Sequence, residues 1–482
     1  MSNFTERVAI VHLPFNKINS TAFAAGPPMA PAILRALISD VAHTATFDLN
    51  LLLQTSLSPA SVKRLYEWCN YYSDVPLSPD EEVSQAIIDI VTTISDDFST
   101  ICLSCFSFSS VEITIKICTL LRGKGKRIIV GGYGITTPFN TTHLSFGEFL
   151  IKSKLATCVV YGDAEDIFRD VILNKREGII RVDNASAKFT SIIPDYSDYD
   201  LSKYNSNSLP IKITGSKGCV RNCSFCDVNS IWPKYIYKTA LQLFNEIQLM
   251  HSTHGFNEFV FTDNLINGSP SELRKLNQLL IDSRLSIKYK GQYVVRSKKS
   301  MPELDYSLMK SAGCTDVYIG IDSGSSEVRA LMNKSSTDDD LYYTVEQLLD
   351  KNISQHWNII IGFPNETDED FFQSIRLLQK YEKYNKNITV SGLTVYQHNQ
   401  GEPLMFDEKY KHLNITSSTN SYSSYFWKSS KYPTNSFPVR VDRYNKFVEF
   451  LQKNSWFVSP DIIARRGYLN LLLKKYLESQ NN

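Results

Sequence analysis

The sequence predicts an α/β protein with two parallel-sheet domains, followed by a small, mostly helical C-terminal part. Short apolar strands alternate with helical patterns in two stretches of the chain, and a polar stretch without apolar periodicity lies between them. The length of 482 residues also exceeds what one hydrophobic core usually organises. We therefore expect domains at 1–180, 210–400 and 401–482, with a linker at 181–209.

The first domain is predicted to be a doubly wound, Rossmann-like parallel sheet. Strands are expected in RVAIV, HTATFD, STICLS, RIIVGG and ATCVVYG, and helices in PPMAPAILRALISD, EITIKICTLLRG and AEDIFRDVI. The strands are continuously apolar, as expected where helices cover both faces of a sheet. Ligands of such sheets bind at the carboxyl ends of the strands. Small residues stand there, namely Ser107, Ser109, Gly131, Gly132 and Gly162.

The second domain is predicted to be a partial (β/α)6 barrel. After the linker, which is rich in Asp, Ser, Asn and Tyr, six strands alternate with helices. They are expected at 210–215, 257–263, 286–294, 316–322, 356–362 and 388–396. The active site of such a barrel would lie at the carboxyl ends of these strands.

Composition favours a cytoplasmic protein without a membrane segment. The chain is 43% hydrophobic and 21% charged with a net charge of +1, so no overall field favours nucleic acid or a membrane surface. The N-terminus MSNFTERVAIVHLPF lacks the features of a signal peptide. Lys and Arg outnumber Asp and Glu between Lys428 and Lys475. This surplus predicts either a solvated helical face or contact with a phosphate-bearing or nucleic-acid substrate.

Three cysteines stand close together in GSKGCVRNCSFCDV, at Cys219, Cys223 and Cys226. The remaining six of the nine cysteines stand singly in apolar surroundings, where we expect small buried side chains: Cys69, Cys102, Cys105, Cys118, Cys158 and Cys314. In a reducing compartment such cysteines do not form a disulfide framework. The close trio is therefore the candidate metal site.

The number of thiolates discriminates between the possible metals. Structural zinc needs four protein ligands, and His251 with His254 would give an unusual spacing and leave Cys219 over. An electron-transfer cluster needs a fourth cysteine, but the next is the distant Cys314. Three thiolates can hold three irons of a [4Fe–4S] cluster and leave the fourth iron open to a chelating small molecule.

The cysteine loop resembles the signature C-x3-C-x-Φ-C of the radical S-adenosylmethionine (SAM) enzymes, in which Φ is aromatic. Cys219, Cys223, Phe225 and Cys226 match its positions, on a loop after the first strand of the predicted barrel. The resemblance implies that the open iron binds SAM and that an electron cleaves it to a 5′-deoxyadenosyl radical. It also implies that Phe225 packs beside the adenine.

Three further segments are similar to the family in the expected order: FVFTDNLING, VYIGIDSGS and IIIGFPNETDEDF. Asp322 stands where Glu is commoner, and Asn365 replaces the usual Gly beside Pro364. The resemblance implies a SAM site that includes Phe225, Asp263, Asn264, Asp322, Ser323 and Gly362.

The first domain resembles the cobalamin-binding subgroup of this family in ILRALISDVAHTATFDLN, IIVGGYGITT and YGDAEDIF. The resemblance implies cobalamin over the strand ends, between this domain and the barrel, near Ser107, Ser109, Gly131, Gly132 and Gly162. The D-x-H-x-x-G motif is missing, so we expect no histidine ligand below the cobalt. In that chemistry one SAM supplies the radical and another supplies a methyl group by way of cobalt, which suggests a C-methyltransferase.

Two alternatives stay open. One is a radical SAM cyclase, oxidoreductase or methylthiotransferase that does not use a corrinoid, although a methylthiotransferase usually has a second compact cysteine trio. The other is a zinc-stabilised nucleic-acid-binding protein. For the favoured reading we expect an unknown substrate, an external electron donor such as flavodoxin or ferredoxin, and no membrane. Nucleic acid could bind through the basic C-terminal part.

Overall fold

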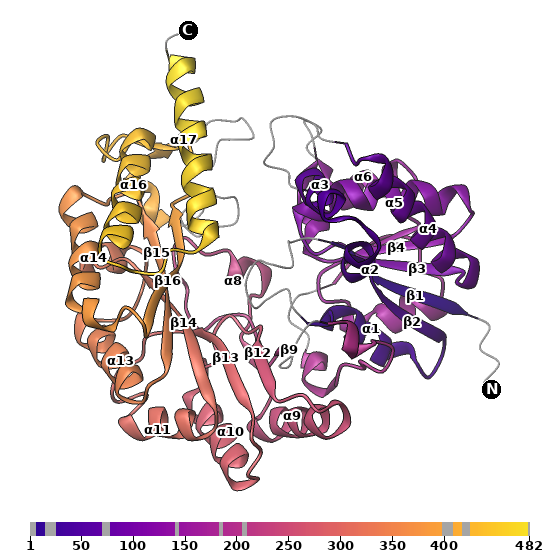
Figure 1. Ribbon diagram of the computed structural model, residues 1–482, viewed down its shortest axis with the longest axis horizontal. Coiled ribbons are helices and arrows are strands. Elements are labelled where there is room, and N and C mark those ends of the chain that lie inside the picture. The colour runs from indigo at the N-terminus through magenta and orange to yellow at the C-terminus, as the bar shows by residue number, and fades with distance from the viewer. Residues whose placement is uncertain are drawn as a thin grey trace. The chain divides into compact units, whose positions relative to one another are not determined.

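The computed structural model describes residues 6–14, 26–69, 78–139, 144–182, 187–204, 210–397, 408–416 and 425–480. The chain divides into two compact units, Met1–Ile213 and Thr214–Asn482 (Figure 1). The predicted α/β class is confirmed, because each unit is built on parallel strands. No helix in these ranges is long and apolar enough to cross a bilayer.

The first unit contains a six-stranded parallel sheet in the order β2-β1-β3-β4-β7-β8. Its strands are β1 (Arg7–His12), β2 (His43–Asp48), β3 (Thr100–Ser104), β4 (Arg127–Gly131), β7 (Cys158–Tyr161) and β8 (Gly178–Arg181). The chain order changes direction at β1, which pairs with β2 on one side and β3 on the other. The carboxyl ends of β1 and β3 therefore form the switch point where doubly wound sheets bind ligands.

Helices cover both faces of this sheet (Figure 1). Val8 and Ile10 pack with α1 (Met29–Ile38) and α7 (Phe168–Leu173) in one core. The alternate residues Ala9 and Val11 belong to a second core on the other face, with α2 (Leu49–Ser56), α3 (Pro59–Cys69), α4 (Glu81–Asp97), α5 (Val111–Gly123) and α6 (Phe146–Lys152). The sequence patterns did not predict α2, α3, α4, α6 or β8.

The stretch at 181–209 was expected to be a linker, and its described part packs against the first unit. Arg35 of α1 forms ion pairs with Asp195 and with Asp198, the latter at 2.8 Å. Tyr196 and Tyr199 are buried. The division between the units falls later, after Ile213.

The second parallel sheet has the order β16-β15-β14-β13-β12-β9, which is the sequence order of a partial barrel. Its strands lie at the six predicted positions: β9 (Pro210–Ile213), β12 (Glu258–Phe261), β13 (Lys288–Tyr293), β14 (Cys314–Asp322), β15 (Ser354–Ile361) and β16 (Ile388–Val395). Helices lie along the outer face (Figure 1), namely α9 (Ala240–His254), α10 (Pro270–Asp282), α11 (Glu303–Ser311), α13 (Asp338–Asp350) and α14 (Asp368–Lys380). The short helices α8 (Val228–Ile231) and α12 (Ser326–Leu331) follow strand ends.

The two faces of this second sheet differ in polarity. Along β14, Val317 and Ile319 are fully buried, whereas the alternate Tyr318 is only half-buried. On that half-buried face the ring of His356 stacks on Tyr318 with centroids 4.6 Å apart. The half-buried, polar side of the sheet is the barrel interior, where a polar molecule can be accommodated.

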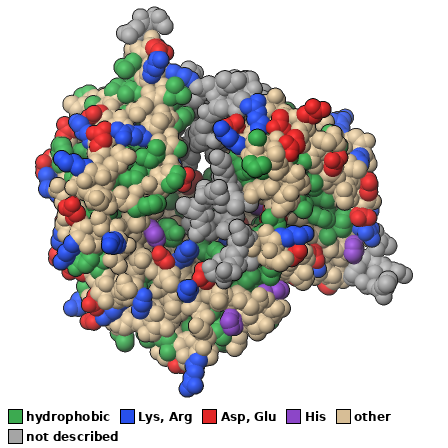
Figure 2. All heavy atoms as spheres, viewed as in Figure 1, with side chains coloured by type: hydrophobic (Ala, Val, Ile, Leu, Met, Phe, Trp, Pro, Cys, Tyr) green, Lys and Arg blue, Asp and Glu red, His purple; other side chains and the backbone are tan. Residues whose placement is uncertain are grey.

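The described C-terminal part is mainly helical, as predicted, with η8 (Glu408–Leu413), α16 (Phe437–Lys453) and α17 (Pro460–Gln480). Much of its basic surplus is used within the unit: Arg440 and Arg443 are buried, and Arg466 pairs with Glu449 at 2.6 Å. On the visible face, Lys and Arg side chains are interspersed with Asp and Glu (Figure 2). This arrangement favours the solvated-face interpretation of the surplus.

Candidate active site

The cysteine loop follows the first barrel strand and is closed by a short hairpin. β10 (Ser216–Lys217) pairs antiparallel with β11 (Ile236–Tyr237), and the cysteines lie between them. Gly218 has φ +82°, and a Cβ added there would clash with the carbonyl oxygen of Lys234. Only glycine therefore fits where the loop turns back onto its own base.

The three loop cysteines differ in exposure from the rest. Cys219, Cys223 and Cys226 are partly exposed, whereas the six other cysteines are buried as predicted. The backbone N–H of Arg221 donates to the sulfur of Cys219 at 3.4 Å, a contact that favours the thiolate. Burial raises the pKa of Cys226 to about 12 and also raises that of Cys223, so cation binding at these sulfurs must release protons.

The zinc alternative has no matching site in the described ranges. There, no three His, Cys, Asp or Glu side chains lie close enough together to hold one metal ion. The Nδ1 atom of His251 instead contacts the carbonyl oxygen of Phe256 at 2.8 Å. A cluster fits the donor set better, because each of its thiolates binds a different iron.

Two residues after β12 hold the loop in place. Asp263 accepts from the Gly215 N–H at 2.8 Å and from the Ser216 hydroxyl at 2.5 Å. Burial raises the pKa of Asp263 to about 6, although these hydrogen bonds work against the increase. Asn264 donates to the carbonyl oxygen of Gly218 at 3.2 Å. Both side chains are predicted to bind SAM, and in the structure they also brace the cysteine loop.

Asp322 ends β14 in a left-handed conformation, with φ +63°, and is buried. It forms an ion pair with Lys334, whose Nζ also donates to the carbonyl oxygen of Gly320 at 2.7 Å. Burial lowers the pKa of Lys334, but the charges of Asp322 and Cys223 outweigh it and raise the pKa overall. Lys334 therefore stays positive beside the cysteine loop. The adjacent Ser323 is fully buried, and its hydroxyl accepts from the Ser325 N–H at 3.1 Å.

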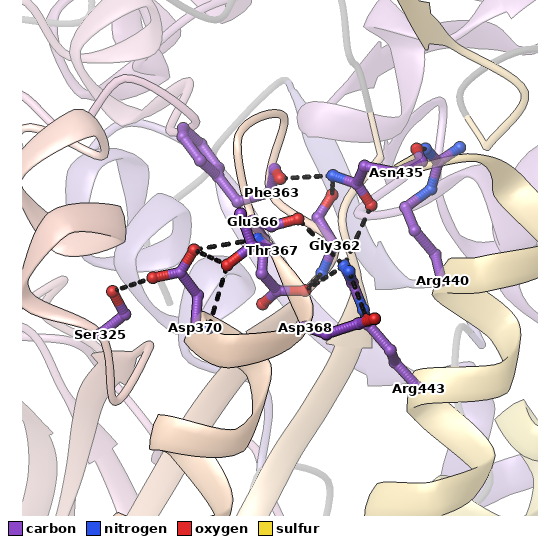
Figure 3. A network of polar contacts seen from close by, with 10 residues as sticks. All are labelled: Ser325, Gly362, Phe363, Glu366, Thr367, Asp368, Asp370, Asn435, Arg440 and Arg443. Carbon is purple, nitrogen blue, oxygen red and sulfur yellow. Dashed lines mark hydrogen bonds and ion pairs between the residues drawn. The ribbon is translucent and has the colours of Figure 1, made fainter. Parts of the chain in front are cut away.

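The turn after β15 is held by arginines from α16, as Figure 3 shows. Gly362 has φ +78°, and a Cβ there would clash with the side chain of Arg440. Arg440 is fully buried, lies 3.8 Å from the ring centroid of Trp427, and donates to the carbonyl oxygen of Asn435 at 2.5 Å. Gly362 is predicted to bind SAM, and the structure gives a second reason for glycine at this position, because the side chain of Arg440 fills the space of a Cβ.

Glu366 is the buried acid of the same turn (Figure 3). One of its oxygens accepts from the Gly362 N–H at 2.7 Å and from Arg443 at 3.1 Å. Burial raises the pKa of Glu366 to about 7, although Arg443 works against the increase. Arg443 also donates to Asp368 at 2.9 Å, so one α16 side chain fixes both ends of the turn.

Phe225 lies at the border between the cysteine loop and the C-terminal part. It is partly buried against an apolar cluster that includes Met332, Phe363 and Trp427. Packed aromatic groups thus support the ring that is predicted to lie beside the adenine. Lys334, Arg440 and Arg443 were not predicted, because single basic residues outside a motif carry no local signal.

The residues predicted to bind cobalamin lie at strand ends of the first unit. Gly132 has φ +99°, and a Cβ there would approach the Cys105 carbonyl oxygen to 2.5 Å, so the fold itself requires this glycine. Gly131 meets only ordinary contacts, Gly162 has φ +91°, and the Ser107 hydroxyl accepts from the Ser109 N–H at 3.1 Å.

Next to these residues, two aromatic side chains stand at the surface: Phe106 after β3 is 54% exposed, and Tyr133 after β4 is 51% exposed. Exposed aromatic groups beside strand ends are what a large flat ligand could cover. His12 ends β1 beside Ser104, and burial together with Lys212 lowers its pKa to about 3.

Residues 213–378 match the model of the radical SAM superfamily. This segment is a radical SAM domain. An uncharacterised methyltransferase of Pyrococcus horikoshii is 27% identical over 196 residues, which are 39% of this chain and 41% of that protein. A threonylcarbamoyladenosine tRNA methylthiotransferase of Thermotoga maritima is 28% identical over 174 residues, 34% of this chain and 39% of that protein. The chain thus spans less than half the length of these relatives.

Two solved structures resemble the chain over both the radical SAM domain and the N-terminal unit. The methyltransferase TsrM of Kitasatospora setae, solved with cobalamin and a [4Fe–4S] cluster, has a TM-score of 0.59 and 14% identity over 86% of this chain and 78% of that one. The cobalamin-dependent radical enzyme OxsB, solved with aqua-cobalamin, has a TM-score of 0.60 and 13% identity over 86% of this chain and 62% of that one. At these identities the likeness establishes a shared fold.

Proposed function

We propose that this protein is a radical SAM enzyme and a cobalamin-dependent C-methyltransferase. The observation that carries the proposal is the cysteine trio in the radical SAM domain. All nine cysteines lie in the described ranges, and these three are the only ones that are partly exposed. When bound, the cluster supplies the electron that cleaves SAM to methionine and a 5′-deoxyadenosyl radical. When bound, cobalamin supplies a carrier for the methyl group.

Five residues of the domain hold the cluster and its loop. Cys219, Cys223 and Cys226 hold the cluster, and Asp263 with Asn264 keeps their loop in shape. The half-exposed inner face of the barrel, where His356 hydrogen-bonds to Asp316 at 3.1 Å, receives a polar substrate.

Cobalamin is proposed from three lines of support. TsrM and OxsB were solved with it and share the fold over both units. Phe106 and Tyr133 offer exposed aromatic surface beyond β3 and β4. The strand order changes direction at β1, which is the usual ligand position in such sheets.

A methylthiotransferase is the weaker proposal, although one of the relatives above has that name. Apart from the trio, every cysteine is buried: Cys69, Cys102, Cys105, Cys118, Cys158 and Cys314. Buried thiols of this kind do not offer a second cluster site.

The test starts with anaerobic purification and reconstitution. We expect about four irons and four sulfides per chain, and formation of 5′-deoxyadenosine and methionine from SAM with dithionite. Titration with hydroxocobalamin should then give a bound corrinoid by absorbance, and its Co(II) form should show no hyperfine splitting from a histidine nitrogen in electron paramagnetic resonance.

The resonance experiment tests His12 in particular, because His12 is the histidine at the carboxyl end of β1, where cobalamin is proposed to bind. Splitting that disappears in His12→Ala would identify His12 as a cobalt ligand and reject the prediction of a histidine-free cobalt. If the protein does not retain corrinoid, the cobalamin-dependent part of the proposal is rejected and a corrinoid-independent radical SAM enzyme remains. If it does not hold iron, the whole proposal is rejected.

A further inference from the structure

The inner face of the second sheet carries a row of polar side chains across four neighbouring strands. The members of this polar row are in register on β13, β14, β15 and β16: Gln292, Tyr318, His356 and Thr389. All four are partly exposed, and the His356 side chain retains 22% exposure. A molecule inside the barrel can therefore reach the polar row.

Two rings of the polar row form a fixed aromatic surface. The Nδ1 atom of His356 lies 2.7 Å from the Thr389 hydroxyl, and Nε2 lies 3.1 Å from Asp316. Burial alone would raise the pKa of Asp316, but the hydrogen bond from His356 lowers it overall, so this carboxylate accepts from Nε2. The held ring stacks on Tyr318 at an interplanar angle of 25°. Such a pair offers a planar group a preformed aromatic contact.

Asn358 stands beyond the polar row, toward the carboxyl ends of the strands. Its register partners are two glycines, Gly320 on β14 and Gly392 on β16. A Cβ on Gly392 would clash with the side-chain oxygen of Asn358, so the amide lies over that glycine. The Ser391 hydroxyl donates to the same oxygen at 3.3 Å. Within the described ranges, the amide N–H groups of Asn358 donate to no protein group.

The sheet is irregular at this level. The pairing of β15 with β16 shifts between Trp357 and Asn358, which makes Ser391 an extra residue of β16. The pairing of β14 with β15 shifts between Gly320 and Asp322. Bulges of this kind change the direction of side chains and are frequent beside active sites. Here the bulge places the Ser391 hydroxyl where it fixes the oxygen of Asn358.

The charged side chains on either side of Asn358 are compensated. Toward the carboxyl ends, Lys334 forms an ion pair with Asp322. Toward the amino ends, Asp316 is in register with Lys290. A charged ligand would therefore meet no uncompensated opposite charge beside Asn358, whereas an uncharged acceptor can receive its N–H groups.

We propose that Asn358 determines substrate specificity, and that the substrate carries a planar, uncharged aromatic or heteroaromatic ring with a carbonyl oxygen or ring nitrogen. The ring packs on the aromatic surface of Tyr318 and His356, and its acceptor receives an N–H group of Asn358. Asparagine amides recognise planar heterocycles in this way in other binding sites. The proposal rests on the proposed function, which places the substrate on this inner face.

The test uses three small probes whose chemistry differs in one respect at a time. Benzamide has a planar ring and an uncharged carbonyl acceptor. Benzoate keeps the ring but is anionic, and cyclohexanecarboxamide keeps the amide but loses the planar ring. Their dissociation constants are measured by saturation-transfer NMR titration of the full chain, before and after reconstitution of the cluster. We expect benzamide to bind about 10-fold more tightly than either other probe.

Two substitutions test the site and one serves as the control. Asn358→Asp keeps the shape of the side chain but removes its N–H donors, and Tyr318→Leu removes the aromatic contact. Asn387→Asp is the matched control, because Asn387 is also a partly exposed asparagine of the second unit and directly precedes β16. Both site variants should bind benzamide about 10-fold more weakly, and the control should match the wild type. Thermal unfolding checks that each variant is folded.

Different outcomes reject different parts of the proposal. Equal binding of benzamide and cyclohexanecarboxamide by the wild type would reject a planar ring, and tighter binding of benzoate would reject an uncharged substrate. Unchanged benzamide affinity in Asn358→Asp, or no benzamide binding by the wild type, would overturn the role of Asn358. Loss of iron or of SAM cleavage in a wild type that still binds benzamide would instead reject the proposed function.

Discussion

Each six-stranded sheet has an aspartate at the carboxyl end of a strand, and the two residues, Asp48 and Asp263, have different structural roles. Asp48 ends β2, accepts from the N–H groups of Asn50 and Leu51 at 3.1 and 3.4 Å, and receives the Tyr204 hydroxyl at 3.1 Å. Asp263, just after β12, accepts from Gly215 and Ser216 at the base of the cysteine loop. The first aspartate caps a helix, whereas the second shapes the candidate active site.

The comparison shows that a carboxylate at a strand end can be engaged by groups of its own unit. Burial raises the pKa of both aspartates to about 6, and the hydrogen-bond donors to each carboxylate belong to its own unit. The two sheets differ in how their faces are covered. Helices cover both faces of the first sheet, whereas one face of the second stays polar and half-exposed.

The largest expected effect separates the two kinds of cysteine. Cys219→Ala, Cys223→Ala or Cys226→Ala should reduce iron from about four per chain to near zero and abolish SAM cleavage, because two thiolates do not fix a cluster. Cys158→Ala, in β7 of the first sheet, should keep its iron. Iron and sulfide analysis after anaerobic reconstitution measures the difference. A triple loop variant that retains its iron would contradict the assignment.

The next effect concerns buried charge. Arg443→Met leaves Glu366 buried without its cation, which should lower the free energy of unfolding of the second unit by about 3–5 kcal/mol. Adding Glu366→Gln should restore a large part of that loss. In the first unit, Arg35→Met should cost about 1 kcal/mol, because Asp195 and Asp198 remain partly exposed. Urea unfolding followed separately for each unit makes the comparison.

If the double variant Arg443→Met/Glu366→Gln were no more stable than Arg443→Met, the loss would come from packing rather than from uncompensated charge. The intact cluster content of the folded protein serves as the control for the cysteine loop. Gly362→Ala should also lower the free energy of unfolding of the second unit, because the positive φ and the side chain of Arg440 both disfavour a Cβ there.

The free energy of unfolding should depend on pH in the same way through Asp48 in the first unit and Asp263 in the second. Their folded pKa of about 6 lies above the ordinary value of 3.8, so their contribution to stability is complete below about pH 4 and is lost as the pH rises to about 6. Two pKa units correspond to roughly 3 kcal/mol for each group. Asp48→Asn and Asp263→Asn should each flatten this pH dependence in their own unit. Only Asp263→Asn should also lower cluster retention, which separates the two roles.

Periodicity and motifs predicted much of this molecule, and long-range packing explains the rest. All six barrel strands are found near their expected positions because alternating polarity and turn residues are local signals. The three helices between β2 and β3 were missed, as was the packing of Tyr196 and Tyr199 on the first unit. Gly362 and Asp263 fit a binding motif, which does not reveal that Gly362 packs on Arg440 or that Asp263 accepts from Gly215. Local sequence patterns do not predict contacts between residues that are so far apart along the chain.

The smallest effect compares two phenylalanines, one beside each sheet. Phe225 is partly buried against Phe363 and Trp427, whereas Phe106 is 54% exposed. Because base–aromatic stacking is worth about 1–3 kcal/mol, Phe225→Leu should weaken SAM binding about 10-fold and leave hydroxocobalamin binding unchanged. Phe106→Leu should do the reverse if it covers the corrinoid. Equilibrium titrations of both ligands with both variants give four affinities. A Phe225→Leu protein with unchanged SAM affinity would show that this ring supports the aromatic cluster and does not touch the adenine.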